Sequence, residues 1–179
     1  MGSRLRVPAV GAALTLLVVA GVVPRAPGWS GVLGPTALAN TEGSPEALAR
    51  RVMDAMQAGD LDRLRALALT EQEFRAHVWP ALPAARPERN VPFDFVWERL
   101  EQNSEGHLRQ TVAATRGAPL TLRQVRFAGP ASRYGDVVVR RSTELVLAAP
   151  DGTEWVVRLF GSTIEQDGRY KVFSYVVGD

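Results

Sequence analysis

Few side chains in this chain combine the type and the spacing that catalysis requires. The chain has two histidines, His77 and His107. His77 follows Glu73 by four residues, so a carboxylate could orient its imidazole as a general base. His107 follows Ser104 in an expected first helical turn, where a local structural role is favoured. A lone histidine is weak support for a site, so we assign no catalytic residue.

A second group of side chains could line an apolar pocket. Asp94 and Glu98 lie four residues apart on one expected helix, with Trp97 beside them. Burial in an apolar pocket would make either carboxyl a base, whereas a solvated acidic face is the commoner explanation. Arg158 stands among apolar residues and requires an anion, from one of these carboxylates, from a ligand or from a purely structural salt bridge. The candidate ligand-binding residues are Asp94, Trp97, Arg158, Phe160 and Tyr175.

The composition excludes several kinds of chemistry. The chain has no cysteine, which removes disulfides, thiol catalysis and thiolate metal sites. The sequence contains no glycine-rich phosphate loop and no Gly-x-Ser-x-Gly nucleophile motif. It also lacks the cluster of histidines and carboxylates that a metal site needs. We therefore expect neither a metal nor a cofactor.

The N-terminal residues predict export. Arg4 and Arg6 precede residues 7–23, which carry no charge, and this basic-then-apolar order is that of a signal peptide. Ala37 and Ala39 form an A-x-A pattern, so cleavage after Ala39 fits; an uncleaved membrane anchor is the alternative. Residues 1–39 are thus predicted to be signal or anchor plus linker. The expected location is the periplasm, the cell envelope or the extracellular space, with membrane contact only through an uncleaved N-terminus.

The charge of the remaining chain gives no reason to expect nucleic acid. The whole sequence has 21 basic and 19 acidic residues. Arg4, Arg6 and Arg25 lie before Asn40, so 18 basic residues accompany the 19 acidic ones from there onward. A near-neutral domain with mixed charges lacks the basic surface that nucleic-acid binding requires.

Helix signals fill the first half of the chain. Ser44 is a good N-cap, Pro45 suits the first helical position, and Gly59 ends this helix. Asp60 caps a second short helix, and Thr70 with Glu73 forms a capping box for a third. A proline-rich loop follows at 80–92. The next helix begins after Pro92, is interrupted at 103–107, and resumes behind Ser104.

Strand signals fill the second half. After Gly117 the pattern changes, and residues 119–129 alternate as a strand. Three further strands are joined by Asp-Gly turns at 151–152 and 167–168, which is a strong hairpin signal because glycine tolerates positive φ. Helices followed by an antiparallel meander indicate an α+β domain over residues 44–179.

This order of elements resembles the NTF2-like superfamily, which includes ketosteroid isomerase and the SnoaL-type cyclases. The resemblance rests on "ALARRVMDAMQAGDLDRLRAL" at the start and "DGRYKVFSYVV" at the end. It implies a cystatin-like cone, in which N-terminal helices pack on a curved antiparallel sheet around a pocket, and frequent homodimers. The proline-rich insertion at 80–92 departs from short members of the family. The fold does not select a function, because it serves enzymes and binding modules alike.

The alternation of the strands predicts two apolar sheet faces. If both Asp-Gly turns are two-residue loops, Arg158 lies opposite Leu145 and shares a face with Phe160 and Tyr175. We assign that face to the helices. The opposite face would carry an apolar patch large enough to meet a partner, and we expect a homodimer through it. This patch comprises Trp155, Leu159, Val172 and Val176.

These observations favour an exported, non-enzymatic binding or accessory module with a pocket for a small apolar ligand. The first alternative is a pocket enzyme that transfers a proton or adds water, with Asp94 or His77 as base and Tyr175 or Arg158 stabilising negative charge. The second alternative is an envelope structural protein held by its uncleaved N-terminus.

Overall fold

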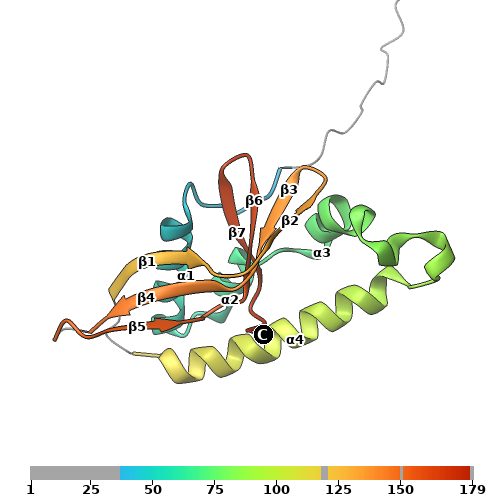
Figure 1. Ribbon diagram of the computed structural model, residues 1–179. Helices are drawn as coiled ribbons and strands as arrows, with labels where there is room; N and C mark the ends of the chain where they lie inside the picture. Colours follow the sequence, from blue (N-terminus) through green and yellow to red (C-terminus); the bar gives the residue numbers. More distant parts are fainter. Residues whose placement is uncertain (1–36, 118–120, 150, 178–179) are drawn as a thin grey trace, which may run out of the picture. The chain divides into compact units, whose positions relative to one another are not determined.

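The structure is a computed structural model that describes residues 37–117, 121–149 and 151–177. The predicted signal at residues 7–23 lies outside the described residues. Helices occupy the first part of the described chain, and two antiparallel sheets occupy the second (Figure 1). The predicted α+β class is confirmed.

The first two helices have the bounds that their caps predict. Helix α1 (Pro45–Ala58) begins at the N-cap Ser44 and ends at Gly59, whose φ of 70° is left-handed. Helix α2 (Leu61–Leu67) begins at Asp60, whose carboxylate accepts a backbone N–H of the first turn. In both cases a side chain satisfies an N–H group that the helix itself leaves free.

A run of short helical turns follows. Helix α3 (Glu71–Glu73) begins with the predicted capping box of Thr70 and Glu73. The chain then widens into the π-helix η1 (Phe74–Val78), a rare conformation that is frequent at functional sites. Three short 3₁₀ turns cross the proline-rich insertion: η2 (Trp79–Ala81), η3 (Pro83–Ala85) and η4 (Pro87–Arg89).

The long helix α4 (Phe93–Thr115) is continuous, and the predicted interruption at 103–107 is wrong. Ser104 caps no helix; its hydroxyl accepts the backbone N–H of Tyr175 at 2.9 Å. Gly106 is exposed and has no neighbouring atom to crowd it. A single glycine costs a helix only about 1 kcal/mol, and the packing on both sides of it offsets that cost.

The strands form two sheets where the sequence predicted one meander of longer strands. In the first sheet β1 (Thr121–Phe127), β4 (Thr143–Ala148) and β5 (Glu154–Val157) pair in the order β1-β4-β5. In the second sheet the order is β2-β3-β6-β7, with β2 (Ala131–Tyr134), β3 (Val137–Arg140), β6 (Ser162–Gln166) and β7 (Arg169–Ser174). The chain passes from one sheet to the other at 128–130, 141–142 and 158–161.

The two hairpins differ in how well the sequence predicts them. Between β6 and β7, Asp167 and Gly168 both have positive φ, as a two-residue turn requires, and the register is the predicted one from Thr163 to Gln166. A register shift then pairs Ser162 with Ser174 instead of the predicted Phe173. Between β4 and β5 the loop is longer, because Ala149 donates its N–H to the Thr153 carbonyl. Leu145 therefore pairs with Val157 instead of Arg158.

This one-residue difference reverses the predicted faces of β5. Trp155 and Val157 pack against the apolar core, and Val156 is the exposed residue. Leu159 and Val172 are buried in the same core. The predicted dimer surface of Trp155, Leu159, Val172 and Val176 is therefore not an exposed patch, and the homodimer stays an untested prediction.

Two apolar clusters hold the domain together, and β7 contributes to both. Val172 belongs to the first cluster, with α1, α2 and the C-terminal part of α4. Phe173 packs on the second cluster, with η1 and the N-terminal part of α4. Both faces of this strand thus meet helices of the same chain, which explains why its sequence is apolar on both sides.

Within the described ranges, no helix combines the length and the apolarity needed to cross a membrane.

Candidate functional site

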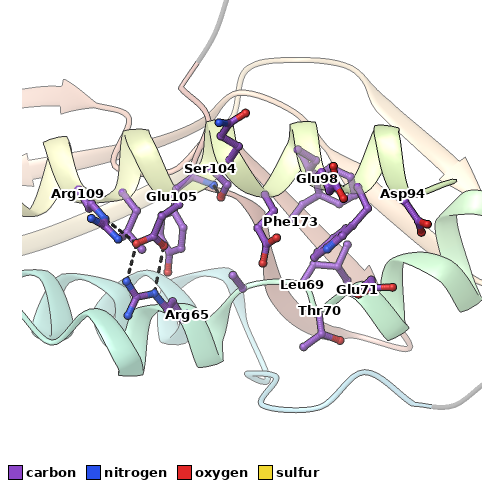
Figure 2. Close-up of a pocket in the computed structure, with 17 residues that line it drawn as sticks. Arg65, Leu69, Thr70, Glu71, Asp94, Glu98, Ser104, Glu105, Arg109 and Phe173 are labelled. Atoms are coloured by element: carbon purple, nitrogen blue, oxygen red, sulfur yellow. Dashed lines mark hydrogen bonds and ion pairs between the residues drawn. The ribbon is translucent and has the colours of Figure 1, made fainter. Parts of the chain in front are cut away.

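A groove of about 1040 Å³ lies between α4 on one side and residues 65–71 on the other (Figure 2). Phe173 of β7 and Tyr175, just beyond this strand, also line it. Its apolar surface comprises Ala68, Leu69, Trp97, Leu100, Leu108 and Phe173. Its carboxylates are Glu71, Asp94, Glu98, Glu101 and Glu105. Arg65 and Arg109 are the two basic residues that line it.

Most of these carboxylates belong to one stripe of α4. Asp94, Glu98, Glu101 and Glu105 follow one another at intervals of four, three and four residues. Residues at such intervals share a helix face. The stripe runs beside the apolar row that includes Trp97, so the groove has an acidic edge along an apolar floor.

Arginines neutralise the acidic stripe at one end of the groove. Arg65 binds both carboxylate oxygens of Glu105, at 3.1 and 2.5 Å, and Arg109 donates to the same carboxylate at 2.8 Å (Figure 2). The hydrogen bonds from Arg65, with those from Arg109, lower the pKa of Glu105 to about 2. Glu105 is thus committed to contacts within the chain.

A third arginine, Arg75, neutralises the other end. Arg75 lies 2.9 Å from Glu71 and 3.4 Å from Asp94, measured from Nη2 to the nearest carboxylate oxygen. Its guanidinium carbon also lies 3.5 Å from the centre of the Phe93 ring, in cation–π geometry. Asp94 is therefore paired.

The middle of the groove is different. Glu98 and Glu101 are exposed, and neither side chain has an ion pair or a hydrogen bond with any described residue. The groove thus carries two uncompensated carboxylates beside Trp97, between two arginine-bound ends. This is the part of the site that a cationic group would complement.

The structure brings three of the five predicted site residues to the groove. Asp94, Trp97 and Tyr175 line it, whereas Arg158 and Phe160 do not. Arg158 donates to Glu144 across the β4–β5 pair at 3.0 Å, so its anion comes from within the fold. Phe160 is 1% exposed and belongs to the first apolar cluster.

Tyr175 has a structural contact that removes it from ligand chemistry. Its side chain is buried, and its hydroxyl donates to the Leu64 carbonyl at 2.8 Å. Burial raises the pKa of this phenol well above its usual value. The hydroxyl therefore ties the end of β7 to α2 and is unavailable to stabilise charge on a bound molecule.

His77 belongs to a separate cluster, in which its own side chain is buried and that of Asp136 is 35% exposed. The π-helix η1 directs His77 into the protein, where Nδ1 lies 3.1 Å from Asp136. Asp136 also accepts from Gln166 at 2.6 Å. The predicted orienting partner, Glu73, is wrong for this role, because Glu73 pairs with Lys171. His77 Nε2 is buried and has no hydrogen-bond partner in the described part of the chain.

The sequence contained a signal for the acidic stripe that the predicted helix break concealed. With α4 divided at 103–107, Glu105 was separated from the helix that carries Asp94, Glu98 and Glu101. Undivided, the periodicity places all four carboxylates on one face. The pairing of Arg65 with Glu105 had no local signal, because 40 residues separate them.

No group of histidines, cysteines and carboxylates in the described ranges could hold a metal ion. Comparisons of the chain with protein-family models, with curated proteins and with solved structures find no match.

Proposed function

We propose that this chain is an exported, non-enzymatic binding module of the NTF2-like type, whose groove takes an apolar ligand that carries a cationic group. The order of elements supports the architecture: helices come first, and antiparallel strands follow. Export rests on the basic and apolar N-terminal residues.

The observation that carries the ligand class is the pair of uncompensated carboxylates. Glu98 and Glu101 stand beside Trp97, and the apolar floor continues through Leu69 and Phe173. An alkyl or aromatic body would displace water from that floor. An ammonium or guanidinium group would then contact the carboxylates and the face of the indole ring.

The same geometry favours binding over proton transfer. Asp94 has a side chain that is 78% exposed and paired with Arg75, which removes the apolar setting that a ketosteroid-isomerase-like base requires. The groove lining contains no histidine. The phenol of Tyr175 is engaged within the fold. The groove therefore provides shape and charge for binding, but neither a buried catalytic base nor a free phenol.

Charge selectivity tests this proposal. Octyltrimethylammonium and octyl sulfate, both below their micelle concentrations, are titrated into the protein while the indole N–H signal of Trp97 is followed by NMR. We expect the ammonium to bind at least about tenfold more tightly, because a like charge beside Glu98 and Glu101 opposes the sulfate. Equal binding of the two probes would contradict the proposed ligand class.

Removing the two free carboxylates should weaken binding without harming the fold. In Glu98→Gln/Glu101→Gln we expect about 3- to 10-fold lower affinity for octyltrimethylammonium, since exposed ion pairs contribute about 0.2–1 kcal/mol each. The matched control is Asp54→Asn/Glu88→Gln, which changes the net charge equally at two exposed positions outside the groove. An equal loss in the control would assign the effect to net charge and reject the site.

A further inference from the structure

Residues 37–42, here called the strap, are part of the folded domain. Leu38 is 7% exposed and belongs to the second apolar cluster, with Leu69, Phe74 and Ile164. A leucine in such a position contributes to stability as any core residue does. The segment that contains the predicted cleavage motif is therefore packed and not a free tail.

The strap is also hydrogen-bonded to three parts of the fold. Leu38 donates its backbone N–H to Gln166 at 2.8 Å, and Ala39 donates its own to Glu73 at 2.8 Å. Farther along, Glu42 exchanges both backbone hydrogen bonds with Tyr170, each at 2.8 Å. The strap thus pairs with the edge of β7. Without the strap, the backbone groups of this edge at Tyr170 would be unpaired.

The acceptors of the strap belong to the buried polar groups of the domain. Glu73 also accepts from Lys171, which is fully buried. Gln166 also donates to Asp136, which holds His77. Losing the N–H of Ala39 or Leu38 would leave one of these acceptors short of a partner, and an unmet hydrogen bond at a buried group is costly.

Cleavage after Ala39 would remove the contacts of Leu38 and Ala39 and would leave, of these contacts, only the pairing of Glu42 with Tyr170. It would remove the Leu38 side chain from the core and would take both backbone donors away from Gln166 and Glu73. We propose that the peptide bond after Ala39 is not a processing site and that the mature protein retains the strap. Any cleavage of the exported chain then occurs before Leu38, and the A-x-A pattern of Ala37 and Ala39 is a structural sequence.

The first test is the N-terminus of the exported protein. The full chain is produced with its own N-terminal residues in an exporting host, and the intact mass of the purified protein is measured. We expect a mass that includes Leu38, from either an upstream cut or no cut. A mature chain that begins at Asn40 would overturn the inference.

A substitution that preserves the motif gives an independent test. Leu38→Ser leaves Ala37 and Ala39 in place, so the A-x-A pattern is unchanged. If the strap is retained, the midpoint of thermal unfolding should fall by about 5–15 °C. Ala37→Ser, at an exposed neighbouring position, is the control and should leave the midpoint unchanged.

The two measurements give distinct outcomes. A protein that keeps Leu38 and loses stability in Leu38→Ser supports the strap. Identical midpoints for Leu38→Ser and the unsubstituted chain would overturn it, because a removed residue cannot affect the mature protein. If Leu38→Ser does not accumulate, the intact mass of the unsubstituted protein decides alone.

Discussion

Gly161→Ala should prevent the native fold or destabilise it by about 4 kcal/mol or more, an effect reserved for backbone clashes and similar defects. A β-carbon at this position would lie 1.7 Å from the carbonyl oxygen of Val176. The obstacle is backbone and cannot rotate away. The free energy of unfolding in urea, or the loss of a cooperative transition, measures the result.

The backbone of Gly161 cannot move aside, because both of its polar groups are engaged. Its N–H donates to the Ser174 carbonyl at 3.2 Å, and its carbonyl accepts from Thr143 at 2.9 Å. This glycine lies where the chain passes from β5 to β6. We infer that it permits the close approach of the C-terminal residues at the bend between the two sheets.

Gly106→Ala is the matched control. Gly106 lies within α4, and a β-carbon there would meet no atom within 4 Å. The same chemical change should stabilise the protein by about 0.5–1 kcal/mol, since alanine is the better helix former. A Gly161→Ala protein as stable as the unsubstituted chain would show that the bend is not constrained as described.

Lys171→Met should destabilise the protein by about 3–5 kcal/mol, the usual cost of breaking a buried ion pair from one side. Lys171 is fully buried, and its Nζ donates to both carboxylate oxygens of Glu73, at 2.9 and 2.8 Å. Methionine fills a similar volume but leaves Glu73 as a buried charge without its cation. Urea unfolding at pH 7 measures the loss.

The loss of stability in Lys171→Met, relative to the unsubstituted protein, should become smaller as the pH falls. Burial raises the pKa of Glu73, but hydrogen bonds from Lys171, Thr70 and Ala39 outweigh it and hold the pKa below its usual value. In the unsubstituted protein, the ionised Glu73 contributes stability above its unfolded pKa of about 4.3. This contribution is lost as the pH falls through the lower folded pKa. Without Lys171 the carboxyl protonates more readily, which relieves the unpaired charge.

Two further variants separate the ion pair from simple loss of charge. Lys171→Met/Glu73→Gln should recover part of the stability, because it removes both charges and retains an oxygen for the Ala39 N–H. Arg133→Met removes a cation at an exposed position and should change stability little. A loss of stability in Lys171→Met that does not depend on pH would contradict the role of the Lys171–Glu73 ion pair. An equal loss in Arg133→Met would contradict it as well.

The sequence predicted the features that short-range interactions determine. The caps at Ser44, Asp60 and Thr70 and the turn at 167–168 are all as expected. Each depends on residues within three or four positions of one another. A side-chain oxygen near a free N–H, or a glycine where φ is positive, suffices.

The predictions failed where distant packing competes with local preference. Residues 103–107 contain turn-forming residues, yet α4 continues through them because Leu108 and the N-terminal half of the helix are held by different apolar clusters. That error also separated Glu105 from the rest of the acidic stripe. Of the groove, the sequence alone identified Asp94, Trp97 and Tyr175. It named Glu98 as a possible base, but it missed Glu101 and the absence of an ion-pair partner for both carboxylates among the described residues.

The sequence by itself determined the class of the domain, the helix starts, the tight β6–β7 turn and the apolar character of both faces of β7. Only the tertiary structure decided what those faces meet, where the chain passes from one sheet to the other, and that Arg158 is paired with Glu144. The reason is the two-residue period of a strand. A shift of one position in the β4–β5 loop exchanges the faces, and that shift depends on which side chains the distant helices can bury.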